Sequence, residues 1–135
     1  RASQPRLRRS VLAVREWALA QGFECSIDAL TVVAGTIAVA EAGGVSASAW
    51  SEERVLRVLW LDAWHWCRNH AVAPPAQFGR ALWVWLEHGA AHGLVDPGET
   101  GLAGLCRAVA SCTAPAHAAT MRRRAKGNHP AGRLR

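Results

Sequence analysis

Tyrosine is absent from this sequence of 135 residues, methionine occurs once and phenylalanine twice, whereas tryptophan occurs seven times. Long apolar runs are missing as well: the longest uncharged one, Ala29–Ala40, spans about twelve residues, and a membrane-spanning helix needs about 20. No signal peptide is visible, because the basic N-terminal residues lead into an amphipathic stretch and not into a short apolar region with a cleavage site. We therefore expect a cytoplasmic protein that does not contact the membrane.

The sequence also lacks the motifs of common catalytic sites. It contains no Walker-type phosphate loop, no GxGxxG, no Ser-His-Asp order and no CxxC pair. The four cysteines are spread along the chain at positions that favour free, buried thiols in a reduced compartment: Cys25, Cys67, Cys106 and Cys112. The sequence thus predicts a non-catalytic protein without a cofactor.

Half of the residues are hydrophobic, which predicts a packed core, and a chain of this length fits one domain. Apolar residues recur at steps of three and four, as they do in helices, and a single β-branched segment would have no strand to pair with. We predict an all-α single domain of four to five helices over residues 1–114, followed by a basic, mobile tail over 115–135. The expected helices span 6–21, 28–42, 52–69, a segment that ends near 89–93, and 99–112.

The stretch 51–93 holds five of the seven tryptophans in two apolar segments that are joined by a Pro-Pro turn. It predicts an antiparallel helical hairpin on which the other helices pack. Ser51 is a favourable N-cap for the helix 52–69, which is apolar on nearly every side, as central helices are. We therefore expect most tryptophans of the hairpin to lie in the core. In the preceding helix, Gly35 can allow a neighbouring element to approach closely.

Basic residues gather at the two ends of the chain. Residues 1–15 hold five arginines, and residues 122–135 hold five arginines and one lysine, with no acidic residue in either segment. Because the ends carry +11 and the whole chain +6, residues 16–121 carry +6 minus +11, or −5. Basic ends favour an anionic partner such as DNA or RNA, and the alternative is that they serve only solubility.

Residues 36–55, TIAVAEAGGVSASAWSEERV, resemble the helix-turn-helix of bacterial repressors. This motif needs a small residue in its first helix, a glycine at the turn and apolar residues that lock the two helices together. The residues in these roles are Ala40, Gly44 and the three locking positions Val39, Val45 and Trp50. Glu53 departs from the pattern, because it occupies an apolar position of the motif. The alternative is an ordinary helix–loop–helix with Ser51 as a cap.

The preferred function is a small nucleic-acid-associated regulatory or accessory module that uses its basic ends and the possible helix-turn-helix over residues 39–55. The residues expected to contact nucleic acid are Arg6, Arg8, Arg9, Arg15, Ser46, Ser48, Arg54, Arg122, Arg123, Arg124 and Lys126.

The alternative function is a protein–protein adaptor or a subunit of a homodimer. Trp83 lies off the inward-facing stripe of its helix, and exposed tryptophan and arginine residues are common anchors of interfaces. Arg68 and Arg80 flank the Pro-Pro turn and can add charge to this surface.

A weaker candidate is a metal site. His88 and His92 are four residues apart on one helix, a spacing that suits two ligands of one ion, and Glu53 is the expected third ligand. The more ordinary role of two histidines near a helix C-terminus is to complement the helix dipole.

Overall fold

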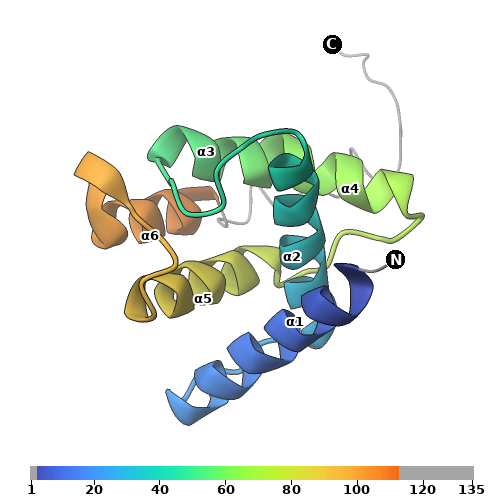
Figure 1. The fold of residues 1–135 in the computed structure, drawn as a ribbon, viewed down its shortest axis with the longest axis horizontal. Helices are drawn as coiled ribbons and strands as arrows, with labels where there is room; N and C mark the ends of the chain where they lie inside the picture. The colour runs from blue at the N-terminus through green and yellow to red at the C-terminus, as the bar shows by residue number, and fades with distance from the viewer. Residues whose placement is uncertain (1–2, 113–135) are drawn as a thin grey trace.

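In the computed structural model, which describes residues 3–112, the chain forms five helical stretches and no strands in that range (Figure 1). The all-α prediction is confirmed. The predicted tail 115–135, with Arg122, Arg123, Arg124 and Lys126, lies outside the described residues. The elements are α1 (Ser3–Ala20), α2 (Ile27–Ala42), α3 (Glu52–Arg57), the π-helical turn η1 (Val58–Asp62), α4 (Ala63–Asn69), α5 (Phe78–Ala91), the 3₁₀ turn η2 (Gly98–Thr100) and α6 (Gly101–Cys112).

Helix boundaries follow from local chemistry. The side chain of Ser26 accepts a hydrogen bond from the backbone N–H of Ala29, and that of Ser51 accepts one from Arg54, so each serine caps a helix, Ser51 as predicted. Gly22, just past the end of α1, has a positive φ of 90°, which glycine adopts without strain. Among residues 3–112, no helix combines the length and the apolar character that crossing a bilayer requires.

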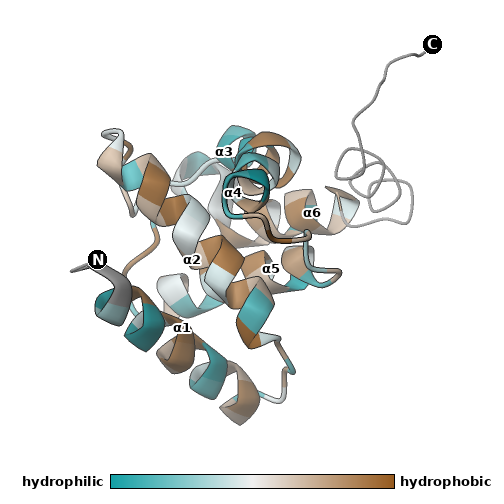
Figure 2. Ribbon diagram, turned by 90° about the vertical axis from the view of Figure 1, so that its right-hand side faces the viewer, coloured by the Kyte–Doolittle hydropathy of each residue, from teal (hydrophilic) through white to brown (hydrophobic). Residues whose placement is uncertain are grey.

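Helix α2 is the central element of the fold. It packs against α1, α4 and α5, and it is mostly brown or white along its length in Figure 2. Its buried residues cover most of the circumference of the helix: Ala29, Leu30, Val32, Val33, Ala34, Gly35, Thr36 and Ile37. The prediction that 52–69 is the central helix is therefore wrong, because α2 is the helix with neighbours on several faces.

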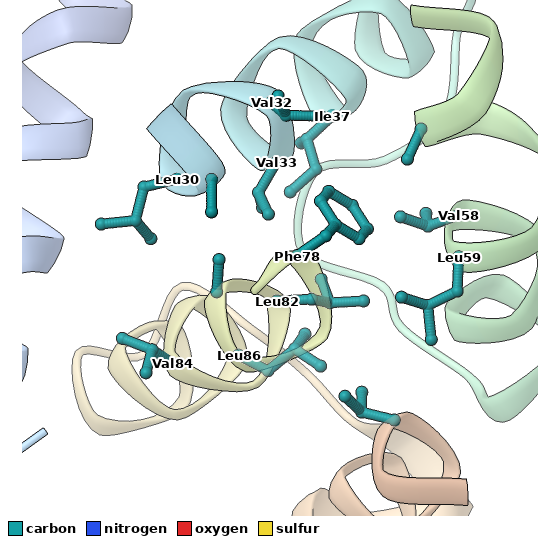
Figure 3. Close-up of a cluster of buried hydrophobic side chains, with 14 of the residues drawn as sticks. Leu30, Val32, Val33, Ile37, Val58, Leu59, Phe78, Leu82, Val84 and Leu86 are labelled. Carbon is teal, nitrogen blue, oxygen red and sulfur yellow. The ribbon is translucent and has the colours of Figure 1, made fainter. Parts of the chain in front are cut away.

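The predicted hairpin over 51–93 also needs correction. The continuous helix α3–η1–α4 and helix α5 do run in opposite directions (Figure 1). However, α5 packs mainly against α2, α6 and α1, while α3 packs against α6 and α4 against α2. The two arms meet through core side chains, with Val58 and Leu59 opposite Phe78 and Leu82 (Figure 3). They thus form two walls of the core and not a closely packed pair.

The helix Glu52–Asn69 has the predicted bounds but only one buried side. That side carries Val55, Val58, Leu59, Ala63 and Cys67. Trp60, Trp64 and Trp66 are only partly buried, and so is Trp85 of α5. Among the described tryptophans only Trp50, 4% exposed, lies in the core, so the expectation that most tryptophans of the hairpin are core residues is wrong. Their large, amphipathic rings pack at the boundary of the core instead.

Helices α2 and α4 come together where Gly35 faces Trp66. A Cβ atom on Gly35 would lie 2.5 Å from Cε2 and Nε1 of the Trp66 ring, which is too close for any side chain. The missing side chain therefore allows the indole to rest on the backbone of α2, as the sequence predicted for a close neighbour.

Replacing Gly35 by alanine is expected to destabilise the fold by about 1–3 kcal/mol, because the added methyl group overlaps the Trp66 ring. Urea unfolding followed by circular dichroism measures the change in the free energy of unfolding. In a Trp66→Leu background the ring is gone, so the same substitution should become neutral or stabilising by up to about 1 kcal/mol through helix propensity. An equal loss in both backgrounds would rule out this contact as the cause.

Candidate functional site

A groove of about 380 Å³ runs along the outer side of α5. Its walls and floor come from three parts of the chain: Phe23 from the α1–α2 connection, Gln77, Arg80, Trp83, Val84 and Glu87 from the α5 segment, and Val109 from α6. The lining is apolar in its middle and polar at its two ends. It combines side chains that are far apart in the sequence, so it depends on the whole fold.

The position of the groove follows from the two faces of α5. Phe78, Leu82 and Leu86 point into the core and hold the helix against α2. Arg80, Trp83, Val84 and Glu87 have i, i+3, i+4, i+7 spacing, which places them together on another face. Trp83 is 39% exposed and Phe23 is 41% exposed, whereas Val84 is buried and forms the floor. The two exposed aromatic rings of Phe23 and Trp83 therefore border a groove whose lining also includes the buried aliphatic side chain of Val84.

Glu87 is already engaged by hydrogen bonds within the protein. Its Oε2 accepts a hydrogen bond of 2.8 Å from Nε1 of Trp83, and the thiol of Cys106 donates to the same oxygen at 3.9 Å. Burial, together with the nearby Glu87 carboxylate, raises the pKa of Cys106 to about 11. The thiol thus stays protonated at neutral pH and is a poor nucleophile.

Arg80 and Glu87 are the charged groups of the groove, and neither has an ionic partner among the described residues; Arg80 has no hydrogen bond within them either. Arg80 is exposed, and the one ion pair within residues 3–112 joins Arg57 to Asp62 elsewhere. Its positive charge reaches Cys25, whose pKa is nevertheless raised because burial has the larger effect. A guanidinium beside apolar walls offers an anion a charge-assisted, bidentate contact.

The structure brings together two of the three residues predicted for a protein interface. Trp83 and Arg80 line the same groove. Arg68 does not line it, since its guanidinium lies on α4, 5.3 Å from the centre of the Trp64 ring. Phe23 was missed by the sequence analysis, although a phenylalanine in the otherwise polar connection between Gly22 and Ser26 was an available signal.

The segment that resembles a helix-turn-helix does not pack as that motif does. Val39 is 61% exposed and Val45 is 46% exposed, so two of the three residues expected to pack between the helices do not hold them together. The connection between the helices runs from Gly43 to Ser51, longer than the turn of about three to four residues in the motif. The predicted locking is therefore wrong, and the motif contributes nothing to the function proposed below.

The remaining residues predicted to contact nucleic acid differ in whether their side chains are already bonded within the protein. Nη1 of Arg54 donates 2.6 Å hydrogen bonds to the carbonyl oxygens of Ser46 and Ala49, and its guanidinium lies 4.0 Å from the Trp50 ring centre. The hydroxyl of Ser46 bonds to Ser48. These residues stabilise their own loop. By contrast, the arginines of α1 face outward: Arg6, Arg8 and Arg9 are exposed and Arg15 is partly buried.

His88 and His92 form an aromatic cluster with Trp17. The two imidazoles stack with ring centres 4.2 Å apart, and the Trp17 ring meets that of His88 edge-on at 5.5 Å. Nδ1 of His92 lies 2.8 Å from the carbonyl oxygen of His88. No set of three potential ligands exists in the described part of the chain, so the expected grouping with Glu53 does not form. The cluster packs α5 against α1.

No protein-family model, curated protein or solved structure matches this chain. We therefore argue function from the geometry. The groove offers an apolar surface and the exposed guanidinium of Arg80, two features with which protein interfaces bind a partner.

Acidification is expected to destabilise the fold through His88. Burial and the charge of His92 hold the pKa of His88 below its usual value of about 6.5. Since the unfolded chain binds this proton more readily, the contribution of His88 is complete above the unfolded pKa and is lost as pH falls through the folded pKa. Urea unfolding between about pH 8 and pH 5 should show this loss, and a His88→Gln variant should show less of it. The same pH dependence in both proteins would contradict this role.

Proposed function

We propose that this protein is a non-catalytic protein–protein interaction module that binds its partner through the groove along α5. The observation that carries the proposal is the placement of Phe23 and Trp83, two exposed aromatic side chains, on one concave surface with Arg80. Aromatic and arginine side chains dominate the binding energy of interfaces: the rings bury large areas with few rotatable bonds, and the guanidinium makes bidentate, charge-assisted hydrogen bonds. A single exposed aromatic or arginine side chain would need no explanation, but here two aromatic rings and one guanidinium line the same groove.

The shape of the groove supports a protein partner over a small ligand. From Gln77 to Glu87 it extends over ten residues of the α5 segment, or about 15 Å at the helical rise. Its volume of about 380 Å³ lies at the low end of the range for small-molecule pockets, so the elongated shape and not the volume favours a protein partner. Pockets for small molecules enclose most of the ligand surface, whereas elongated grooves of this kind take a row of side chains from a partner.

Replacing Trp83 by alanine is expected to weaken partner binding at least about tenfold, because the indole supplies much of the apolar area of the groove. Peptides selected from a randomised display library on the full chain provide the ligands, and isothermal titration calorimetry measures their dissociation constants. Since Trp83 is exposed and lies off the core, the variant should keep the thermal unfolding midpoint of the unaltered protein to within a few degrees.

Val39→Ala is the matched control, because Val39 is more exposed than Trp83 and does not line the groove. It should leave the affinities unchanged. If the selected peptides bind the Trp83→Ala protein as tightly as the unaltered one, the groove is not the binding surface. Should the partner be a second copy of the chain, sedimentation would reveal a dimer that the Trp83 substitution dissociates.

A second candidate function is nucleic-acid binding, and the arginines of α1 favour it. Arg6, Arg8 and Arg9 are exposed on a helix that carries no acidic residue before Glu16. Side chains placed in this way can neutralise phosphates without reading bases, so the affinity would depend on salt and little on sequence.

Under this second function, replacing Arg6, Arg8 and Arg9 by glutamine should lower the affinity for duplex DNA. It should also reduce the slope of log K against log salt by about 0.9 for each lost phosphate contact. Fluorescence anisotropy over a salt series measures both quantities. Deletion of residues 122–135 tests the other basic end in the same way. An affinity that stays constant as salt rises would exclude nucleic-acid binding through these charges.

A further inference from the structure

The ring of Trp83 is held by a hydrogen bond to its own helix. Because 39% of the side chain is exposed, core packing restrains it only in part, and a tryptophan on a helix surface has more than one staggered rotamer open to it. Its Nε1 donates a hydrogen bond of 2.8 Å to Oε2 of Glu87. The two residues are four apart, so the bond spans one turn of α5 and favours the rotamer in which the indole lines the groove.

The side chain of Glu87 is in turn held from α6. It is partly buried, and its Oε2 also accepts a hydrogen bond of 3.9 Å from Sγ of Cys106. The raised pKa of this thiol keeps it protonated at neutral pH, so it can donate. No lysine or arginine of residues 3–112 forms an ion pair with this carboxylate. Within the described part of the chain, two donors on two helices therefore hold it, and no salt bridge does.

A ring with one orientation binds a partner more tightly than a ring with several. A partner that fits one rotamer meets only the fraction of molecules in which that rotamer is populated, and the apparent dissociation constant rises as that fraction falls. One side-chain hydrogen bond changes such a population by about two- to tenfold. The bond also uses the only N–H of the indole, so the ring offers the partner an apolar surface without a polar group that needs pairing.

Resting on the proposed function of the groove, we infer that Glu87 is a positioning residue for partner binding: its carboxylate holds the Trp83 indole in the orientation that the partner meets. Glu87 acts on the partner through that ring and not through its own charge. The role therefore needs an acceptor oxygen at this position, and it does not need a negative charge.

Two substitutions of Glu87 separate the acceptor from the charge. Glu87→Ala removes both, whereas Glu87→Gln keeps a carbonyl oxygen at the same reach and loses only the charge. The peptides selected from the display library on the unaltered full chain are titrated into each variant by calorimetry. They should bind Glu87→Ala about three- to tenfold more weakly and Glu87→Gln with a loss of at most about twofold. Equal losses in the two variants would mean that the partner contacts the charge itself, and they would overturn the inference.

The orientation of the ring can also be measured without a ligand. In the ¹⁵N-labelled full chain, the indole N–H signal of Trp83 is the one that a Trp83→Phe variant lacks. Its heteronuclear NOE, which reports motion on the ps–ns scale, should be high in the unaltered protein and in Glu87→Gln. In Glu87→Ala it should fall to the value of a mobile side chain. An unchanged value there would mean that another contact holds the ring, and it would contradict the inference.

Glu16→Ala is the matched control, because Glu16 is exposed on α1 and does not line the groove. It removes the same charge as Glu87→Ala. It should alter the peptide affinities by less than about twofold and leave the Trp83 signal unchanged. A loss of affinity equal to that of Glu87→Ala would assign the effect to the net charge of the protein, against the inference.

The two proposals fail in different ways. If the selected peptides bind Trp83→Ala as tightly as the unaltered protein, the groove is not a binding surface and the proposed function fails. If their binding depends on Trp83 but Glu87→Ala leaves the affinity unaltered, the groove remains the binding surface, and only the positioning role of Glu87 fails.

Discussion

The contact between Gly35 and Trp66 is the constraint on which the arrangement of the other helices depends. Because α2 carries no side chain at that point, α4 can lie directly on its backbone. With one side of α2 covered by α4, helices α1 and α5 pack on its remaining sides. The core face of α5 is thereby committed to α2, and the opposite face, with Arg80 and Trp83, is left for the groove.

Local features of the fold were predicted correctly from the sequence, whereas the central helix was not. The caps Ser26 and Ser51 act through neighbouring backbone groups, so local sequence suffices to find them. Both 29–40 and 52–69 are rich in apolar residues, but 29–40 holds no charged residue and 52–69 holds six, a difference that already favours 29–40 as the central helix. Side-chain size separates them as well: α2 has nothing larger than leucine or isoleucine, so neighbours can approach closely on several sides. The tryptophans of 52–69 are too bulky for that and pack at the boundary.

The candidate site was only partly predictable. Trp83 and Arg80 belong to one helix, and their position off the core stripe follows from helical geometry alone. Phe23 reaches the groove from another part of the chain, and Arg68 fails to reach it because α4 and α5 are not close neighbours. Both outcomes depend on tertiary packing, which short-range patterns do not encode. The contact of Trp17 with His88 depends likewise on where α1 crosses α5.

The π-helical turn η1 sets the register of the long helix. In this turn the N–H of Ala63 donates to the carbonyl oxygen of Val58, five residues back, so the turn holds one residue more than an α-helical turn. The extra residue lets Val55, Leu59, Ala63 and Cys67 stay on one side, although steps of four would drift around a regular α-helix. Loss of a single residue from this turn would convert it into a regular α-helical turn and would leave the residues after it, Trp66 among them, on the side that they occupy now. Loss of a residue from α3 or α4 would instead rotate everything after it by about 100°. The turn is therefore the place along this helix where a change of length is best tolerated.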